Sequence, residues 1–215
     1  MLEDRILLID GEAIVIDKPA GLPVDPPRRG GDSVVGRIDE LKCGFRRPPV
    51  VMHRLDQDTS GCLLLARNPR ARAAFQKAFE DRGVEKYYLA VVGSENAEEE
   101  GVIDVPVGKR SSAEAGWRMV ADPAGQRAVT RWRKLAARGG RTLVEFQPLT
   151  GRTHQIRVHA REAFGSGIAG DRVYGIPGGA MLLHASRLVV PRGAKPAIDV
   201  TAPLPEHFGE WRDAR

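Results

Sequence analysis

The sequence predicts an α+β fold in which a large mixed or antiparallel sheet is flanked by helices. Strand-like segments dominate, and their order with the helical ones fits neither the strict alternation of a parallel α/β sheet nor an all-β fold. At 215 residues, of which 42% are hydrophobic and 28% charged, the chain can bury a sizeable core as one large domain or two small lobes. We find no internal repeat and no obvious linker, so we expect residues 1–215 to form a single domain.

Apolar runs and two-residue alternation mark the expected strands. They are residues 6–9, 13–16, 50–52, 63–66, 84–92, 102–107, 127–135, 141–149 and 181–190. Asp10 and Gly11 join the first two strands and form a dipeptide that favours a tight hairpin turn. The segment from Gly108 to Gln126 lies between two later strands and is predicted to be a long turn or hairpin.

A first long helix is predicted over residues 70–82. Asn68 and Pro69 precede it as an N-cap and a proline at the first helical position, and Gly83 ends it. Apolar residues recur inside it with helical spacing, which predicts one buried face. They are Ala71, Ala74, Phe75, Ala78 and Phe79.

A second long helix is predicted over residues 153–164, with Gly165 behind it. Its inward positions are expected to be Ile156, Ala160, Ala163 and Phe164. The tail from Pro203 is expected to be irregular.

The stretch of residues 18–31 is rich in proline and glycine and is predicted to be a loop. After it, Asp32 or Ser33 caps a short predicted helix that runs to about Lys42.

The net charge indicates a kind of binding partner, and the cysteines indicate a cellular compartment. The net charge of +5 favours a polyanionic partner. The opening residues, MLEDRILLID, have no basic n-region or apolar h-region, and no apolar run is long enough to cross a bilayer. Cys43 and Cys62 have no C-x-x-C partner, which suits a reducing cytosol and gives no sign of a zinc site or a disulfide framework. We therefore expect a cytoplasmic protein.

A polar segment, HRLDQDTSG, separates two apolar strands. If its first four residues continue the preceding strand, Arg54 and Asp56 share one face, while His53 and Leu55 point to the other. Asp56 then opens a turn whose backbone N–H groups can orient its carboxylate, and Gly61 lets the chain re-enter the sheet. This arrangement presents an ionised carboxylate beside a cation at a strand end. An ordinary Asx turn with an ion pair is the alternative.

A second polar segment, LTGRTHQIRVH, opens the second long helix. His154, Arg157 and Arg161 are spaced to lie on one helix face, and Arg152 precedes the helix. A solvated basic face explains such spacing, but an inward Arg157 would also be a natural counter-ion for a buried carboxylate at Asp56.

A third segment, VEKYYLAVV, is one of the expected strands. Alternation places Lys86, Tyr88 and Ala90 on one face and the neighbouring residues Tyr87 and Leu89 on the other. Packing in the core or at a sheet edge is the ordinary role of a tyrosine at such a position.

The three segments together resemble the RluA-like class of RNA pseudouridine synthases. HRLDQDTSG resembles the catalytic-aspartate motif of that class, KYYLA its K-x-Y-x-A motif, and TGRTHQIRVH its T-G-R-x-H-Q-[IL]-R-x-H motif. Further similar segments are DKPAGL, GDRVYG and LHA. The matches follow the order of the class from about Leu7 to Pro203. Many members carry an N-terminal S4-type RNA-binding domain, which we do not expect here.

The resemblance implies the pseudouridine synthase fold with a central RNA-binding cleft. It also implies that the protein isomerises specific uridines in tRNA, ribosomal RNA or both to pseudouridine. Because this reaction involves no redox change, no cofactor and no metal ion are expected. The target base must be flipped out of its stack to reach such a cleft. We expect RNA as the partner and a monomeric protein.

The resemblance also assigns roles to residues of this sequence. It implies that Asp56 is the catalytic aspartate, that Tyr88 lies against the target base and that Arg157 pairs with the aspartate. Residues implied to line the RNA cleft or to support the site are Arg54, Arg152, His154 and Lys18. Candidate phosphate contacts, for which plain solvation is the alternative, are Arg46, Arg47, Arg67, Arg70 and Arg72.

Two points of mechanism stay open at the level of sequence. The Asp56 carboxylate can act as a nucleophile at C1′ or C6, or through base chemistry at the ribose. Tyr88 offers a surface for stacking and a hydroxyl for proton transfer, but its ordinary pKa of about 10 is high for a base at neutral pH.

Two other classes of function compete with the synthase. A metal-dependent hydrolase would draw its ligands from His53, Asp56, Asp58, His154 and His159. His154 and His159 are five positions apart on a helix, too far around to share one ion, and the sequence has no H-E-x-x-H. A catalytically idle RNA-binding protein would not need a carboxylate in the path of an anionic ligand.

Overall fold

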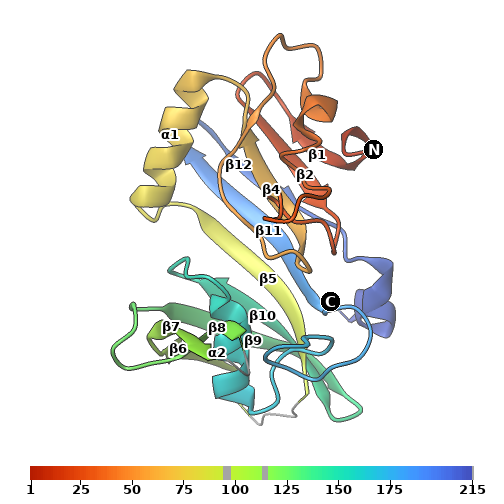
Figure 1. The fold of residues 1–215 in the computed structure, drawn as a ribbon, viewed down its shortest axis with the longest axis vertical. Helices are drawn as coiled ribbons and strands as arrows, with labels where there is room; N and C mark the ends of the chain where they lie inside the picture. The colour runs from red at the N-terminus through yellow and green to blue at the C-terminus, as the bar shows by residue number, and fades with distance from the viewer. Residues whose placement is uncertain (94–97, 113–115, 215) are drawn as a thin grey trace. The chain divides into compact units, whose positions relative to one another are not determined.

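The computed structural model describes residues 1–93, 98–112 and 116–214 (Figure 1). The chain divides into two compact units. The first comprises Met1–Lys86 and His184–Leu204, and the second comprises Tyr87–Leu183 and Pro205–Arg215. The expectation of a single domain stays a prediction.

The first unit is built on a mixed sheet. Its elements are η1 (Glu3–Arg5), β1 (Ile6–Ile9), β2 (Ala13–Lys18), η2 (Ile38–Leu41), β3 (Val50–Val51), β4 (Ser60–Ala66), α1 (Pro69–Glu80), β11 (Leu183–Arg192) and β12 (Lys195–Thr201). The strand order is β1-β2-β4-β11, with β3 paired to β4 and β12 to β11. β4 and β11 run parallel, and the other pairs in this unit are antiparallel.

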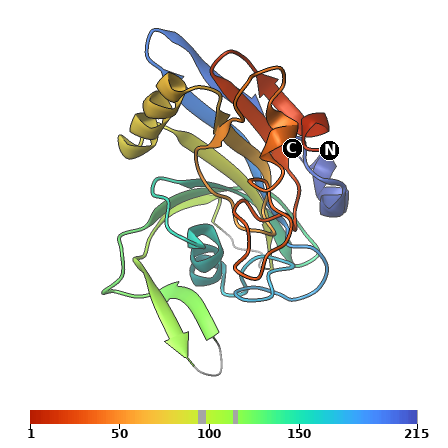
Figure 2. The same ribbon diagram turned by 45° about the horizontal axis from the view of Figure 1, so that its top comes forward.

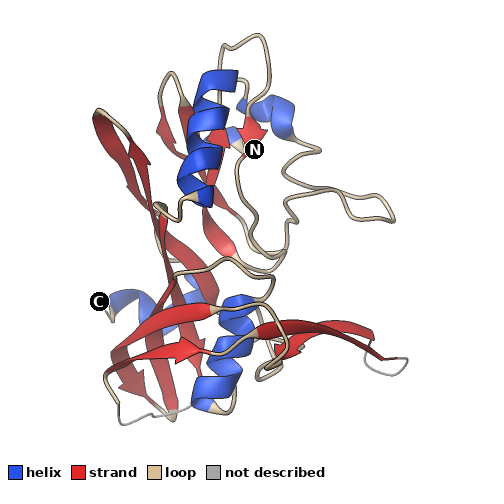
Figure 3. Ribbon diagram, turned by 90° about the vertical axis from the view of Figure 1, so that its left-hand side faces the viewer, coloured by secondary structure: helices blue, strands red, loops and turns tan. Residues whose placement is uncertain are grey.

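One face of this sheet is covered by α1, as Figure 3 shows. Phe75 of α1 is 1% exposed and belongs to a core cluster with Val15 of β2, Leu64 of β4 and Val190 of β11. Full burial of such a side chain contributes roughly 1.5–3 kcal/mol. The helix is therefore held mainly by its apolar face.

The ends of α1 test the predicted capping residues. Asn68 accepts a hydrogen bond from the backbone N–H of Ala71 through its side chain (2.9 Å), so the predicted N-cap is confirmed. At the other end the helix stops at Glu80, and the residue with a left-handed backbone is Arg82 (φ 57°) rather than the expected Gly83.

The second unit is built on an antiparallel sheet. Its elements are β5 (Glu85–Val92), β6 (Glu100–Asp104), β7 (Val107–Ser112), β8 (Gly116–Ala121), β9 (Val129–Arg138), β10 (Arg141–Pro148), α2 (Gln155–Phe164) and η3 (Glu206–Asp213). The strand order is β5-β10-β9-β6. β7 and β8 form a separate two-stranded hairpin, which projects from this unit in Figure 2. The hairpin predicted between Gly108 and Gln126 is thus confirmed outside residues 113–115, which are not among the described residues.

Several local expectations were wrong. The segment predicted as one strand over 102–107 is divided between β6 and β7. The short helix expected to run to Lys42 is limited to the 3-10 turn η2, and the tail predicted to be irregular contains η3. No strand was predicted at β12, because Pro196 and the charged residues of this segment leave only Ile198 and Val200 buried. A proline is tolerated where its missing N–H is not needed by a neighbouring strand.

Candidate active site

Asp56 lies in the irregular connection between β3 and β4. β3 ends at Val51, so the condition under which Asp56 would lie on a continued strand is not met. The expected alternation survives as a burial pattern, because Leu55 is buried (7% exposed) while Arg54 is exposed and Asp56 is half-buried. The backbone N–H of Thr59 donates to the carbonyl oxygen of Asp56 (3.1 Å), which closes the turn that presents this carboxylate.

His53, the first residue of the HRLD motif, is packed into the first unit. Its Nε2 accepts a hydrogen bond from the backbone N–H of Leu64 (3.1 Å), and its ring centroid lies 5.3 Å from that of Phe79. Burial, with repulsion from Lys86, lowers the pKa of His53 to about 3. A neutral imidazole that accepts a backbone hydrogen bond has a structural role here.

Lys18 is the last residue of β2 and is 0% exposed. Its ammonium donates to the carbonyl oxygens of Pro19 (2.8 Å), Leu22 (2.7 Å) and Gln57 (3.0 Å). These three bonds use all the donors of the group. Because Gln57 follows Asp56 directly, Lys18 fastens the turn from within. A side chain buried to this degree is placed to support the turn, and a place of Lys18 at the RNA cleft stays a prediction.

The surroundings of Lys18 lower the pKa of its ammonium group. Burial lowers the pKa of Lys18 to about 8, against the opposing attraction of Asp58, Asp56 and Asp17. The group therefore keeps its proton at neutral pH while it places a positive charge below the Asp56 turn.

Gly61 explains how the turn re-enters the sheet. It has a φ of 107°, and a Cβ there would lie 2.2 Å from the carbonyl oxygen of Ala185. Ser60 and His184 are in register across the parallel β4–β11 pair, and Ser60 Oγ lies 2.9 Å from His184 Nδ1. The T-S-G of one sequence motif and the L-H-A of another thus meet, and only glycine fits at their contact.

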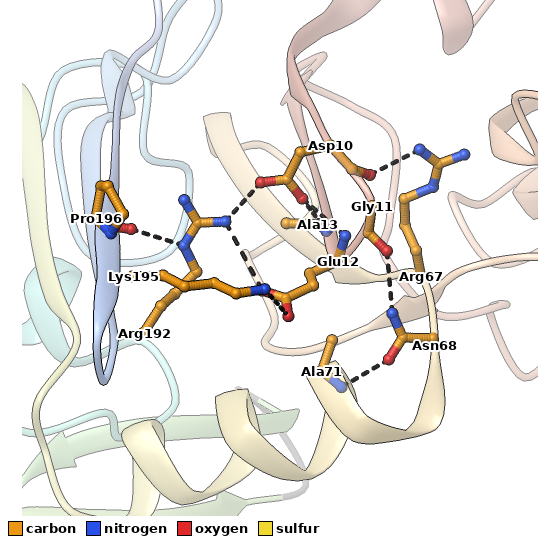
Figure 4. A network of polar contacts seen from close by, with 10 residues as sticks. All are labelled: Asp10, Gly11, Glu12, Ala13, Arg67, Asn68, Ala71, Arg192, Lys195 and Pro196. Atoms are coloured by element: carbon orange, nitrogen blue, oxygen red, sulfur yellow. Dashed lines mark hydrogen bonds and ion pairs between the residues drawn. The ribbon is translucent and has the colours of Figure 1, made fainter.

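Arg54 and Arg67 differ in what they contact. Arg54 is 80% exposed along its side chain and pairs with Asp25 (3.1 Å). Arg67 donates to the carbonyl oxygens of Asp10 (2.7 Å) and Cys43 (3.0 Å), and its guanidinium lies 3.6 Å from the centroid of the Phe45 ring. Figure 4 shows Arg67 held against the β1–β2 turn. An arginine committed in this way is poorly suited to the phosphate contact predicted for it.

In the second unit, Gln155 organises the start of α2. Its side-chain oxygen accepts from Thr150 Oγ1 (2.8 Å) and from the backbone N–H of Arg152 (2.9 Å). Its side-chain nitrogen donates to the carbonyl oxygen of Val129 (3.0 Å) and to Thr130 Oγ1 (2.9 Å). In the turn formed by the T-G-R-x-H-Q pattern, both polar atoms of the Gln155 side chain therefore have hydrogen-bond partners. These bonds fix the direction in which the helix starts.

His159 continues this chain of hydrogen bonds. Its Nε2 lies 2.9 Å from the carbonyl oxygen of Val105, which can only accept, so Nε2 carries the proton and Nδ1 accepts from Thr130 Oγ1 (2.9 Å). Burial lowers the pKa of His159, in keeping with a neutral ring. Both nitrogens of His159 are thus used by the fold. Among the described residues, no group of three or more His, Cys, Asp or Glu side chains converges as a metal site requires.

Arg157 forms a buried bidentate ion pair that sequence reasoning missed. Its Nε and Nη2 donate to the two carboxylate oxygens of Asp171, at 2.6 and 2.8 Å. Arg157 is 9% exposed and Asp171 1%. Burial alone would raise the pKa of Asp171, but the hydrogen bonds and charge of Arg157 outweigh it and hold the pKa below its usual value. The GDRVYG segment carried the only signal that could have pointed to Asp171.

The remaining predicted site residues lie on β5 and near the start of α2. Tyr88 is 9% exposed and lies opposite Phe146 of the neighbouring strand. His154 is the N-cap of α2, with a left-handed backbone (φ 54°), so α2 begins two residues later than predicted. Arg152 donates through Nε to the carbonyl oxygen of Arg127 (3.2 Å).

The structure therefore brings Arg157 and His154 together in the second unit and places Asp56 and Lys18 together in the first. Within its own unit each set can hold charge at a defined place: a half-buried carboxylate above an ammonium, and a guanidinium fixed by a carboxylate. Pairing between Asp56 and Arg157 stays a prediction.

Comparison with known proteins shows close relatives across most of the chain. A family model described as RNA pseudouridylate synthase matches residues 12–162. An uncharacterized RNA pseudouridine synthase of Zymomonas mobilis is 49% identical over 212 residues, which cover 97% of each chain. The ribosomal large subunit pseudouridine synthase D of the same organism is 34% identical over 179 residues, which cover 80% of this chain and 56% of that relative.

A solved structure is similar as well. The human RNA pseudouridylate synthase domain containing 4 has a TM-score of 0.80 and 28% sequence identity, with 96% of this chain and 91% of that chain covered. Among the residues that the structure describes, no helix is long and apolar enough to span a membrane.

Proposed function

This chain belongs to the RNA pseudouridylate synthase family and is an RNA pseudouridine synthase, an isomerase; from that premise we propose that Asp56 is its catalytic carboxylate. The resemblance found in the sequence and the pseudouridine synthase fold are both confirmed. One observation supports the role of Asp56 most directly. It is the residue of the HRLD motif that a turn, fastened by the buried ammonium of Lys18, holds half-exposed.

The chemistry requires a residue of this kind. The C1′–N1 bond of uridine breaks, the uracil turns over, C5 bonds to C1′, and the proton on C5 is lost while N1 gains one. The Asp56 carboxylate assists as a nucleophile at C1′ or C6, or through base chemistry at the ribose. An attacking carboxylate must be ionised, and the buried Lys18 ammonium lies close enough to the carboxylate of Asp56 for the two charges to attract.

We assign Arg157 and Tyr88 to the same reaction. Arg157 would supply the positive charge that answers the carboxylate of Asp56. Its fork to Asp171 supports a role in the site, because the two bonds hold the guanidinium at a fixed place within the second unit. Tyr88 supplies a ring face for the uracil, a hydroxyl for proton transfer, or both.

The proposed substrate is a uridine in tRNA or ribosomal RNA, flipped out of its stack at a cost of a few kcal/mol. The name of the relative from the ribosomal large subunit enzymes favours ribosomal RNA as one candidate. Phosphate contacts must offset the cost of flipping. In the first unit the exposed candidates are Arg46, Arg47, Arg70 and Arg72. In the second unit they are Lys109, Arg110 and Arg118 of the β7–β8 hairpin.

Arg54, Arg152 and His154 are proposed to contact RNA or to support the site. We further propose a cytoplasmic location, which two free cysteines support, and a monomer.

Asp56→Asn tests the proposed function. The amide is nearly isosteric, so the turn should survive, but it cannot act as a nucleophile. RNA from cells that lack the protein, labelled with tritium at C5 of uridine, releases tritium when pseudouridine forms. We expect multiple-turnover release to vanish with Asp56→Asn, while RNA affinity stays equal or rises because a negative charge has left the path of a polyanion.

Asp58→Asn is the matched control, since Asp58 lies exposed in the same turn. It should retain most activity. An inactive Asp58→Asn beside an active Asp56→Asn would move the catalytic role to Asp58. Full activity of both variants would refute a catalytic carboxylate in this turn.

A further inference from the structure

The hydroxyl of Tyr174 joins two parts of the second unit. Its oxygen accepts a hydrogen bond from the backbone N–H of Met119 in β8 (2.9 Å) and lies 2.8 Å from Nδ1 of His154, the N-cap of α2. Tyr174 is 5% exposed. This one hydroxyl therefore ties the β7–β8 hairpin to the start of the helix that carries Arg157.

The ring of Tyr174 extends the connection to Arg157 itself. The Arg157 guanidinium lies 4.9 Å from the centroid of this ring. Asp171, which holds Arg157 in the bidentate fork, also accepts a hydrogen bond from the backbone N–H of Tyr174 (3.0 Å). A displacement of Tyr174 must therefore reach both the face of the guanidinium and the carboxylate that orients it.

The hairpin end of the connection is aromatic and basic. The ring of Trp117 meets the His154 ring edge-on, with centroids 5.4 Å apart, and Lys109 Nζ lies 5.8 Å from the Trp117 ring. Lys109, Arg110 and Arg118 are exposed, and the described hairpin residues, 107–112 and 116–121, include no carboxylate. A surface of this charge attracts a phosphate backbone.

We propose that Tyr174 is a positioning residue through which the β7–β8 hairpin, when it contacts the phosphates of the substrate RNA, sets the orientation of Arg157. This inference rests on the proposed function for the role of Arg157. The Tyr174 hydroxyl then links RNA bound at the hairpin to a correctly aimed guanidinium, beside the direct contact of Trp117 with His154.

Tyr174→Phe isolates this hydroxyl, because phenylalanine keeps the ring beside Arg157. Two consequences are expected. Amide exchange at Met119 should become at least about tenfold faster, since its acceptor is lost. The single-turnover rate of tritium release should fall about tenfold or more at saturating RNA, with RNA affinity changed less than about twofold.

Tyr87→Phe is the matched control. Its hydroxyl accepts from Gln147 Nε2 (3.2 Å) in the same unit, so this variant also loses a tyrosine hydroxyl bond, away from the hairpin. It should leave the exchange at Met119 unchanged. Equal effects of the two variants on the single-turnover rate would reduce Tyr174 to a general contribution to stability and overturn the proposal.

A double-mutant cycle with Arg118→Gln tests the connection itself. With Tyr174 present, Arg118→Gln should weaken RNA binding and also lower the single-turnover rate. With Tyr174→Phe it should weaken binding alone. Independent effects that simply multiply would overturn the proposal.

Amide exchange with and without RNA separates this inference from the proposed function. Total RNA should slow exchange at Met119 in the natural protein and have little effect in Tyr174→Phe. This result does not depend on turnover, so it can stand if the protein forms no pseudouridine under the conditions used. RNA that leaves exchange at Met119 unchanged would refute the connection even in a fully active enzyme.

Discussion

The turn that carries Asp56 and the helix that carries Arg157 are held in place by different means. The turn is irregular, and the buried side chain of Lys18 supports it from within by binding backbone carbonyls. The start of α2 is held by a network of side chains, with Gln155 and Asp171 at its centre. The first arrangement concentrates support in one charged group, whereas the second distributes it over several.

The difference decides how each region should respond to substitution. Loss of a single supporting group such as Lys18 leaves more than one backbone acceptor unsatisfied at once, so the free energy of unfolding should fall strongly. Loss of one member of a network leaves its neighbours partly supported, although coupling among them makes the effects non-additive.

Lys18→Met should produce the largest loss of stability. It keeps the length of the side chain but removes the Lys18 donor from the carbonyls of Pro19 and Leu22, while the carbonyl of Gln57 still accepts from the backbone N–H of Gly21 (2.9 Å). At about 1–3 kcal/mol for each of these two orphaned carbonyls, partly offset by removal of a buried charge, the free energy of unfolding should fall by roughly 4 kcal/mol. Urea unfolding measures this. A loss below about 1 kcal/mol would show that other groups, not Lys18, hold the Asp56 turn.

Asp171→Asn should cost less. The amide oxygen can still accept one hydrogen bond from Arg157, but the amide nitrogen opposes the second donor. We expect a loss of about 3 kcal/mol, at the lower end for a broken buried ion pair. Turnover should also fall at temperatures where the variant is fully folded, so that a loss of folded protein cannot explain the decrease. Turnover equal to that of the natural protein would separate the fork from the reaction.

The sequence predicted the regions of the site better than their internal contacts. HRLDQDTSG and TGRTHQIRVH were recognised because their residues are close together in the chain. The support of each region comes from afar: Gln57 meets Lys18 across 39 positions, and Arg157 meets Asp171 across 14. Single-sequence patterns report local spacing and cannot specify such contacts.

The same reasoning explains the outcome for the fold. The α1 cap at Asn68 and the β1–β2 hairpin were predicted from adjacent residues and are confirmed. The strand β12 was missed because only Ile198 and Val200 are buried in it. The turn that begins at Asp56 was predicted from its own residues, but the point at which the preceding strand stops, Val51, has no comparable local signal.

Tyr88→Phe asks whether the second unit supplies a proton carrier as well as a cation. Phenylalanine retains the ring face for stacking and loses the hydroxyl. If the hydroxyl transfers a proton, turnover should fall by roughly two orders of magnitude, equivalent to about 2.7 kcal/mol, with RNA binding little changed. Near-normal tritium release would leave Tyr88 as a stacking surface and assign the proton to water or Asp56.

His53→Gln should change the pH dependence of stability in the first unit. His53 has a pKa of about 3 in the folded protein against 6.5 ordinarily, so between these values the unfolded chain binds more protons. Its contribution is fully present above pH 6.5 and is lost as the pH falls toward 3. Glutamine can still accept from Leu64 and does not titrate.

The variant should therefore lose less stability on acidification than the natural protein. Between about pH 7 and pH 4.5 we expect a difference of about 1–2 kcal/mol, discounted because the side chain is partly exposed. Urea unfolding at the two pH values measures it. Parallel losses in both proteins would show that His53 is not what makes the first unit sensitive to acid.

The smallest expected effect concerns two exposed arginines, which are compared with one that the fold holds in place. Arg70 and Arg72 are exposed on α1, whereas Arg67, just before that helix, is held by backbone carbonyls and the Phe45 ring. If the first two contact phosphates, each replacement by alanine should reduce the slope of log affinity against log salt by about 0.7–0.9, with stability unchanged.

Arg67→Ala should do the reverse, because its donors are engaged within the protein: stability should fall and the slope should stay. Filter binding of total RNA at several salt concentrations, together with urea unfolding, measures both quantities. An unchanged slope for the double variant Arg70→Ala/Arg72→Ala would place the RNA on another surface, and a reduced slope for Arg67→Ala would mean that RNA binding frees this arginine from the β1–β2 turn.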